Sequence, residues 1–317
     1  MIEGSAPAVL IMAYSRADMV KELLESIPSN RKVYIFLDGP TSSNKESITE
    51  TRLVIEDYIG LPENAEKEIS FRFKDRNLGP KLAFIEAISW AFLTSEYLII
   101  LEEDVRFSSQ FFPYMDWCLE RFKDNQRIGQ INGFSPVNIP LLKNYLFETQ
   151  NSYCWGWGTW RDRWNDNDVD IAYKLDSVNQ TNSLSTIKIG EGYLSLWHDR
   201  IMRVRLGFDT WDFQWNLSML GRGSYAISPS FSLVTNIGIN AEATNTKTAK
   251  IFIRSLSQLS EVKLRLHALK VKRFPSFFNT LSDLIQFKTV SVTPRSGTPI
   301  MLAYSFLLAL RNFFRHL

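Results

Sequence analysis

The residues with the clearest chemical potential are three consecutive acids, Glu102-Glu103-Asp104. They follow Tyr97–Leu101, an apolar run with the length and composition of a buried strand. Three adjacent carboxylates in such a place repel one another, and the repulsion is costly unless a cation neutralises it. Oxygen ligands suit Mg²⁺ or Mn²⁺, which typically bind one or two carboxylates together with substrate phosphates. The triplet therefore predicts a divalent-metal site, with a solvated acidic turn as the alternative.

Tryptophans form the second group of candidate binding residues. Seven of the nine lie between Trp155 and Trp215, within a stretch whose weak periodicity predicts loops and short elements around a pocket. The segment Trp155–Trp160 alternates tryptophan with glycine, which favours a tight loop over a helix or strand. Indole rings bury large areas and often only fill a core, but their faces also stack on the C–H faces of sugars. The cluster is therefore compatible with ligand contact by one or two of these indoles and with core packing by the others.

Strands and helices alternate over the first 105 residues, and these elements must position the acids. Short apolar runs predict strands at Ala8–Ala13, Val33–Leu37, Ile69–Phe73 and Tyr97–Leu101. Helices are expected from the capping-box spacings Ser15 to Asp18 and Ser43 to Glu46, from Pro80, and over Phe111–Phe122. This alternation predicts right-handed crossovers and a mainly parallel sheet, with ligands at the carboxyl ends of its strands.

Several common catalytic motifs are missing from the sequence. It holds no G-x-G-x-x-G after a strand, no G-x-x-x-x-G-K-[ST] phosphate loop and no G-x-S-x-G turn. Its three histidines are scattered, which excludes an H-E-x-x-H protease site. The chemistry must therefore rest on carboxylates, with a hard metal ion as a candidate cofactor.

The composition is that of a soluble globular protein. Of the 317 residues, 45% are hydrophobic and 22% are charged, and the length predicts one large domain or two lobes. The two cysteines cannot form a disulfide framework, which favours the reducing cytosol. No apolar run reaches the roughly 18–20 residues of a spanning helix, and nothing at the N-terminus suggests secretion.

Basic residues are concentrated in the last part of the chain. Residues 250–317 contain 11 Lys and Arg against two acids, a net charge of +9, whereas the preceding 249 residues carry −7. Ile300–Leu310 adds an apolar patch that is too short to span a bilayer but long enough to lie in its interface. We expect residues 250–317 either to meet an anionic membrane surface or to form a solvated basic helix with no partner. A further alternative is that the apolar side chains of Ile300–Leu310 pack on the catalytic domain or on a second subunit.

The order and spacing of several motifs make the sequence similar to GT-A glycosyltransferases. The branch it resembles is that of N-acetylglucosaminyltransferase I, through Ala13-Tyr-Ser-Arg16, Asp38-Gly-Pro40, Asn77-Leu-Gly79, Glu102–Asp104 and Phe111-Phe112. Within this branch it looks like bacterial surface-polysaccharide transferases, through Trp155–Trp160 with Arg161, Trp211–Trp215, Pro229 and Leu233–Gly238. The resemblance covers roughly residues 7–245, and Glu102–Asp104 matches the branch's version of the DxD motif.

The resemblance implies a role for each matching residue. Arg16, Asp38 and Asn77 would line the nucleotide pocket, with Asp38 near the base. Asp104 would hold the metal on the diphosphate, while Glu102 and Glu103 would contact the ribose and the sugar. Asp212 would be the general base, with Asp209 as its rival. The candidates for sugar or acceptor contact are Trp155, Trp157, Trp211 and Trp215.

Two departures from the family pattern bear on these roles. Glu103 stands where an Asp is more usual, and Ala243-Thr244-Asn245 stands where relatives often have Thr-His. These positions concern the metal and the departing diphosphate.

The expected fold class is therefore α/β of the GT-A type, a Rossmann-like, mainly parallel sheet flanked by helices with a basic helical C-terminal extension. The expected units are 1–105 for nucleotide-sugar binding, 106–249 for acceptor binding and catalysis, and 250–317 for the extension. The expected activity is inverting, metal-dependent transfer from a nucleotide sugar, with UDP favoured, to a glycan or lipid-linked glycan. It would take place in the cytoplasm or at the inner membrane face, without nucleic acid. The alternatives are a sugar nucleotidyltransferase, disfavoured because Tyr14–Asp18 lacks the glycines of a phosphate loop, and a non-catalytic carbohydrate-binding protein.

Overall fold

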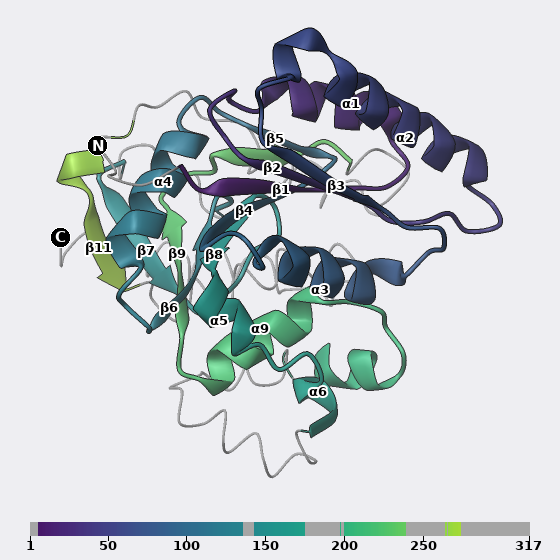
Figure 1. Ribbon diagram of the computed structural model, residues 1–317. Coiled ribbons are helices and arrows are strands. Elements are labelled where there is room, and N and C mark those ends of the chain that lie inside the picture. Colours follow the sequence, from purple (N-terminus) through teal and green to yellow (C-terminus); the bar gives the residue numbers. More distant parts are fainter. Residues whose placement is uncertain are drawn as a thin grey trace, which may run out of the picture.

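A nine-stranded sheet runs through the protein (Figure 1). The computed structural model describes residues 6–135, 143–174, 197, 200–238, 264 and 266–273. In spatial order the strands are β11 (Lys270–Arg273), β7 (Tyr145–Thr149), β9 (Tyr225–Pro229), β6 (Ile128–Asn132), β8 (Trp157–Trp160), β4 (Tyr97–Glu102), β1 (Ala8–Ala13), β2 (Val33–Leu37) and β3 (Ile69–Phe73).

The sheet is mixed and mainly parallel, as the sequence predicts. The strands β3, β2, β1 and β4 are adjacent and all parallel. β8 runs antiparallel to both of its neighbours, β4 and β6. Beyond β6, strand β9 is parallel to it, β7 is antiparallel to β9, and β11 is parallel to β7. The carboxyl ends of the four parallel strands therefore meet at one edge of the sheet, where the acid triplet lies.

Helices cover both faces of the sheet (Figure 1). One face carries α1 (Ala17–Ser26), α2 (Lys45–Gly60) and α4 (Phe111–Phe122); the other carries α3 (Gly79–Ala91), α5 (Arg161–Asn165) and α9 (Asp212–Gly221). Successive residues of β1 serve the two cores in turn, because side chains of a strand alternate between faces. Val9 and Ile11 belong to the core beneath α1 and α4, whereas Leu10 and Met12 belong to the core beneath α3 and α9. The α/β fold class is shown by this arrangement.

Three further short elements lie outside the sheet. They are η1 (Pro62–Asn64), α6 (Ile171–Lys174) and η3 (Leu266–Ala268). α6 and α9 share a smaller apolar cluster that includes Ala172, Trp197 and Leu217.

The helix starts differ from the predicted capping boxes. α1 begins after Arg16 and α2 after Asn44, and neither helix has a side-chain cap hydrogen bond. The Asn44 side chain closes the preceding turn instead, because its Oδ1 accepts hydrogen bonds from the backbone N–H and the hydroxyl of Thr41 at 2.7 and 2.8 Å. Both predicted capping boxes are therefore wrong, although both helices exist.

The glycine-tryptophan segment contains a strand as well as the predicted turn. Gly156 has a φ of +58°, the backbone of a tight turn, but Trp157–Trp160 form β8 inside the sheet. Gly158 permits this close insertion, because a Cβ there would lie 3.1 Å from the carbonyl oxygen of Leu98 in the neighbouring strand. The expectation of a loop alone was wrong.

The described part of the C-terminal region consists mainly of η3 and strand β11. Residues 270–273 pair with β7 as strand β11 rather than continuing a helix. The remainder of the predicted basic helix, including Ile300–Leu310, lies outside the described residues, as does Ala243–Asn245. Over the part of the chain that the structure describes, no helix has the length and apolar character needed to cross a bilayer.

Candidate active site at the carboxyl ends of the parallel strands

The acid triplet forms the turn between β4 and a second, two-stranded sheet. β4 ends at Glu102, and β5 (Val105–Phe107) follows directly after Asp104. β5 pairs antiparallel with β10 (Val234–Asn236), with Asn236 opposite Val105. This pairing brings the end of the Leu233–Gly238 motif against the triplet.

Both carboxylate oxygens of Asp104 accept hydrogen bonds from side chains distant in sequence. Arg16 Nη1 donates to Oδ2 at 2.6 Å, and Asn236 Nδ2 donates to Oδ1 at 3.0 Å. The backbone N–H of Ile237 also donates to the carbonyl oxygen of Asp104 at 2.9 Å. The orientation of Asp104 is therefore fixed from two sides.

Glu103 joins the ends of β1 and β4. It is buried, and its Oε2 accepts the backbone N–H of Tyr14 at 2.6 Å. Arg16 Nε lies 3.8 Å from its other oxygen. Burial raises the pKa of Glu103, although the Tyr14 N–H and the Arg16 charge oppose that change. In this structure Glu103 holds the backbone that positions Arg16.

Glu102 combines partial exposure with a strongly shifted pKa. Loss of hydration is the main cause, followed by the negative charges of Asp104, Asp212 and Glu103, and together they raise the pKa of Glu102 to about 8. Asp212 contributes to this shift, so its carboxylate lies within electrostatic range of Glu102. The structure thus brings the predicted base and the predicted metal ligand to one place.

Asp38 and Asn77 form a second polar cluster beside the triplet. Asp38 Oδ1 accepts the backbone N–H of Leu78 at 2.9 Å, and Asn77 Nδ2 donates to Asp38 Oδ2 at 3.0 Å. Burial raises the pKa of Asp38, against the backbone N–H groups that lower it. Asn77 also lies 3.1 Å from the hydroxyl of Tyr14, whose N–H binds Glu103. Tyr14 therefore links the two clusters.

Gly39 is required by the loop that carries Asn77. A Cβ at Gly39 would collide with the backbone of Arg76, so only glycine lets the two segments pass at this distance. The Asn77 side chain also donates to the Gly39 carbonyl oxygen at 3.1 Å. The Asp38-Gly-Pro40 and Asn77-Leu-Gly79 motifs are thus two halves of one local structure.

Asp212 is the first residue of α9. The hydroxyl of Thr210 donates a hydrogen bond to its Oδ1. Burial raises the pKa of Asp212, and the Thr210 hydrogen bond and the Arg200 charge oppose that change. The rival acid, Asp209, is exposed, and its carboxylate lies against Gly79 at the start of α3, where a Cβ would meet it. The two acids therefore have different surroundings.

The four candidate tryptophans differ in exposure. Trp157 and Trp215 are fully buried, and the Trp215 indole N–H donates to Gln130 Oε1 at 2.6 Å. Trp211 is stacked between Phe84 and Trp157, with ring centroids 4.5 and 5.3 Å away. Trp155 is partly exposed. Trp211 is also buried, so Trp155 is the best placed of the four for contact with a sugar.

Sequence reasoning missed three polar residues of this site. Asn236 belongs to a motif that was recognised, but its contact with Asp104 depends on the pairing of β5 with β10. Thr210 stands two residues before Asp212, a spacing that signals nothing by itself. Cys154 is also close, since the negative charges of Glu102, Asp212 and Asp104 add to the desolvation that raises its pKa. No local pattern around Cys154 could have shown this.

The residues present fit a divalent metal that shares its ligands with a substrate. In the described segments, no three His, Cys, Asp or Glu side chains cluster closely enough to enclose an ion. Asp104 is buried except for about 14% of its side chain, and Glu102 is also partly accessible. Mg²⁺ and Mn²⁺ are commonly held by one or two such carboxylates with phosphate oxygens completing the shell. A closed, all-protein metal cage does not fit.

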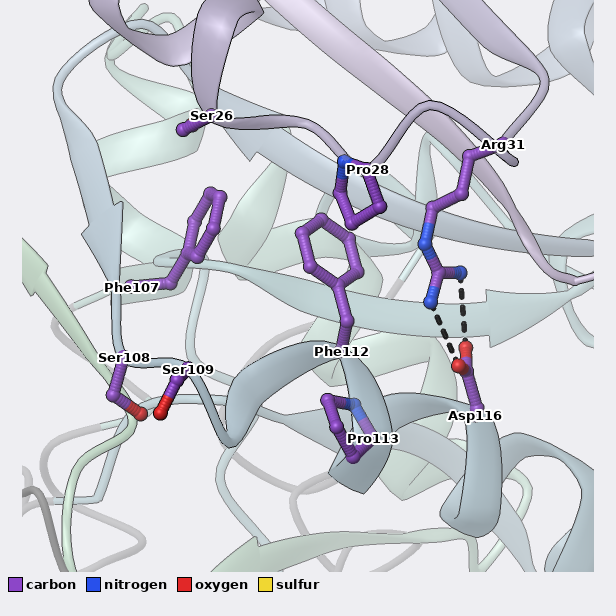
Figure 2. A pocket seen from close by; sticks show the side chains of 9 residues that line it. All are labelled: Ser26, Pro28, Arg31, Phe107, Ser108, Ser109, Phe112, Pro113 and Asp116. Atoms are coloured by element: carbon purple, nitrogen blue, oxygen red, sulfur yellow. Dashed lines mark hydrogen bonds and ion pairs between the residues drawn. The ribbon is translucent and has the colours of Figure 1, made fainter.

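A hollow of about 460 Å³ lies away from these acids, between the end of α1 and the start of α4 (Figure 2). Phe107 and Phe112 form its apolar walls. Arg31 donates to both oxygens of Asp116 at 2.9 and 2.7 Å, so the charged pair beside it is neutral. None of the predicted site residues lines this hollow.

No protein-family model and no curated protein matches the sequence. Among solved structures, the chain is similar to a mannosyltransferase from Pyrobaculum calidifontis in complex with GDP-Man and Mn²⁺, with a TM-score of 0.43, 12% identity, and coverage of 98% of this chain and 81% of that one. It is also similar to GalNAc-T7 with UDP, GalNAc and Mn²⁺, with a TM-score of 0.42 and 10% identity. This match covers 74% of this chain and 44% of that one. A third similar structure is a UDP-glucose pyrophosphorylase complexed with UDP-glucose, with a TM-score of 0.34 and 9% identity. This match covers 72% of this chain and 91% of that one.

Proposed function

We propose that this protein is a GT-A glycosyltransferase of the branch related to N-acetylglucosaminyltransferase I. It moves a sugar from a nucleoside-diphosphate sugar to a hydroxyl group of a glycan or lipid-linked glycan. The observation that carries this proposal is the contact of Arg16 with Asp104 at the carboxyl ends of the parallel strands, with Asp212 in electrostatic range of Glu102 beside them. In open α/β sheets this edge is the usual place for a ligand.

The nucleotide binds across the ends of β1 and β2. Asn77 and the Tyr14 hydroxyl present polar groups beside Asp38, where a base could be recognised. Arg16 offers a guanidinium, the side chain best suited to pairing with phosphate oxygens. We favour UDP as the nucleotide.

Asp104 would hold the divalent metal, with Glu102 as the second available carboxylate. The metal, Mn²⁺ or Mg²⁺, would supply positive charge to the diphosphate that leaves. Glu102 has a pKa of about 8, so its carboxyl group is protonated in most molecules at neutral pH. A nearby cation favours the ionised form of such a carboxyl group.

Asp212 acts as the general base for inverting transfer. It accepts the proton of the acceptor hydroxyl while the hydroxyl oxygen bonds to the anomeric carbon from the face opposite the diphosphate. The anomeric C–O bond breaks, and the electron pair leaves with the nucleoside diphosphate. The raised pKa of Asp212 favours proton acceptance, and a positioned base contributes about 10²–10⁴-fold.

An acceptor with an apolar portion suits the surface next to Asp212. Leu206 and Phe208 are 82% and 53% exposed on the turn that precedes α9, around Gly207 with a φ of +94°. Phe208 packs near Phe213, the residue after Asp212, with ring centroids 5.9 Å apart. These side chains support a lipid-linked acceptor, whose sugar would meet Trp155.

We also propose that the protein works in the cytoplasm, at the inner face of the membrane. The +9 charge of residues 250–317 and the apolar run Ile300–Leu310 support binding to anionic lipid. Flotation with anionic liposomes tests this: binding should fade with added salt and vanish when residues 296–317 are deleted. Equal recovery in the soluble fraction with and without liposomes would refute it.

The activity is tested with a panel of UDP, GDP and CMP sugars in the presence of Mn²⁺. Glycosyl transfer predicts slow release of free nucleotide from one donor without an acceptor, and faster release with the acceptor. Asp104→Asn should nearly abolish it, whereas Glu56→Gln, which changes an exposed acid paired with Arg52 on α2, should not. Wild-type rates in both EDTA and Asp104→Asn would sink the metal assignment.

Two further assays, one with nucleoside triphosphates and sugar phosphates and one with glycans alone, separate the alternative activities. A nucleotidyltransferase would instead form a nucleotide sugar and pyrophosphate from a nucleoside triphosphate and a sugar phosphate. A carbohydrate-binding protein would bind glycans and release no nucleotide from any donor. Either result would overturn the proposed function.

A further inference from the structure

We propose that Arg16 is an internal counter-cation of the acid triplet that competes with the divalent metal for Asp104. Binding of the donor diphosphate would draw Arg16 away from Asp104 and so make this carboxylate available to the metal. The inference rests on the proposed function, in which Asp104 holds the metal. It adds an order of events to that function and gives Arg16 two successive partners.

Arg16 already occupies the place of a cation beside two acids. Its Nη1 lies 2.6 Å from Asp104 Oδ2, and its Nε lies 3.8 Å from Glu103 Oε1. The Arg16 charge also opposes the rise in the pKa of Glu102. One guanidinium thus interacts with all three members of the triplet.

The surroundings of Asp104 leave little freedom for a second cation on the same side. Asn236 holds Oδ1, and Gly238 lies directly against Asp104 Oδ2 and Arg16 Nη1, where even a Cβ would collide with both. A divalent ion on Asp104 would therefore be a close neighbour of the guanidinium. Like charges at short range repel, so the two cations disfavour each other.

Arg16 is free to change partners. Its side chain is 44% exposed, and it stands immediately before α1, outside the helix. A diphosphate offers a guanidinium several charged acceptor oxygens, and Arg pairs with such groups through two parallel hydrogen bonds. Movement of Arg16 onto the diphosphate would remove the positive charge from Asp104 and compensate the negative charge of the nucleotide. Metal and nucleotide would then bind with positive coupling.

The sign of one measurement distinguishes this role from that of a simple phosphate ligand. A simple ligand for phosphate has no effect on metal binding when nucleotide is left out. A competing cation weakens metal binding, so removal of the Arg16 charge should strengthen metal binding. We expect Arg16→Gln to bind Mn²⁺ about tenfold more tightly than the wild type in the absence of nucleotide, a difference of about 1.4 kcal/mol. The same variant should bind nucleoside diphosphate more weakly.

The experiment is Mn²⁺ titration followed by electron paramagnetic resonance, with and without UDP. Arg16→Met is a second neutral variant, and Arg16→Lys, which keeps the charge, should retain weak metal binding. The double variant Arg16→Gln/Asp104→Asn should lose the increase in Mn²⁺ affinity, which would assign the ion to the Asp104 carboxylate. Circular dichroism checks that each variant is folded.

The outcomes separate the inference from the proposed function. Tighter Mn²⁺ binding in both neutral variants supports the inference. Equal or weaker binding in them, with UDP-dependent Mn²⁺ binding intact in the wild type, overturns it and leaves the proposed function standing. If neither the wild type nor any variant binds Mn²⁺, with or without UDP, the metal-dependent function fails and the inference fails with it.

Discussion

Asn236 donates a hydrogen bond to Asp104 Oδ1 at 3.0 Å, across 132 positions of the sequence. The contact exists because β10 pairs with β5 in a sheet of only two strands. The same segment supplies the Ile237 N–H to the Asp104 carbonyl oxygen. The orientation of the proposed metal ligand therefore depends on β10, a strand that follows α9, the helix that begins with the proposed base Asp212.

Asn236→Ala should weaken metal binding in the presence of nucleotide by about 10–100-fold, the usual cost of losing a group that orients a ligand. Manganese titration in saturating UDP measures it. Thr235→Ala, on the opposite face of the same strand, is the matched control. Unchanged metal affinity in Asn236→Ala would mean that Asp104 does not need this hydrogen bond.

Gly39→Ala should destabilise the protein by about 1–3 kcal/mol, because its Cβ would collide with the backbone of Arg76 and cannot be accommodated by a side-chain rotation. Displacement of the Arg76 backbone should also move Asn77 and weaken nucleotide binding. Gly60→Ala is the control, since nothing lies within 4 Å of a Cβ there and the variant should be neutral or slightly more stable. Urea unfolding of the two variants compares them, and equal stability would refute the close approach.

Glu102 should make the free energy of unfolding fall as the pH rises. Its pKa of about 8 in the folded protein lies above the ordinary value of 4.5, so the folded protein keeps a proton that the unfolded chain releases. Its contribution is fully present below about pH 4.5 and is lost as the pH rises through about 8.

Urea unfolding in EDTA between pH 5 and 8.5 measures this dependence. Glu102→Gln should make the free energy of unfolding depend less steeply on pH. Asp38, Glu103 and Asp212, whose pKa values are also raised, contribute to the pH dependence of both proteins. Parallel pH profiles for wild type and Glu102→Gln would contradict the shifted pKa.

Asp212→Asn should reduce transfer by about 10²-fold or more while leaving donor binding intact, as loss of a general base predicts. Steady-state rates and UDP affinity check both parts. Asp209→Asn is the matched comparison, because Asp209 lies against the start of α3 instead. If Asp209→Asn shows the catalytic loss and Asp212→Asn does not, Asp209 is the base and the assignment of Asp212 is wrong.

The parallel half of the sheet could be predicted from the sequence because each strand is a short apolar run with its own turn signals. β1, β2 and β3 have the predicted bounds, and β4 is one residue longer. β1 and β2 are buried along their full length, so their composition alone identifies them. The acid triplet was found for the same reason: it interrupts such a run.

The remaining features depend on contacts that no local pattern encodes. β8 is a strand because it fits antiparallel between β4 and β6, two segments that flank it in space and not in sequence. Asn44 closes the turn with Thr41 and so does not cap α2. The approach of Asp212 to Glu102 likewise follows from where α9 docks, since Trp215 and Met219 pack in the core beneath α3.

The most direct test of the account is a crystal structure of the protein soaked with Mn²⁺ and UDP, GDP or CMP sugars in turn. We predict density for one nucleotide sugar at the carboxyl ends of β1 and β2. Asp104 should hold the metal, Arg16 should have moved onto a phosphate, and the anomeric carbon should face Asp212. A donor bound elsewhere, such as in the hollow beside Phe112, or one whose anomeric carbon points away from Asp212, would contradict the account.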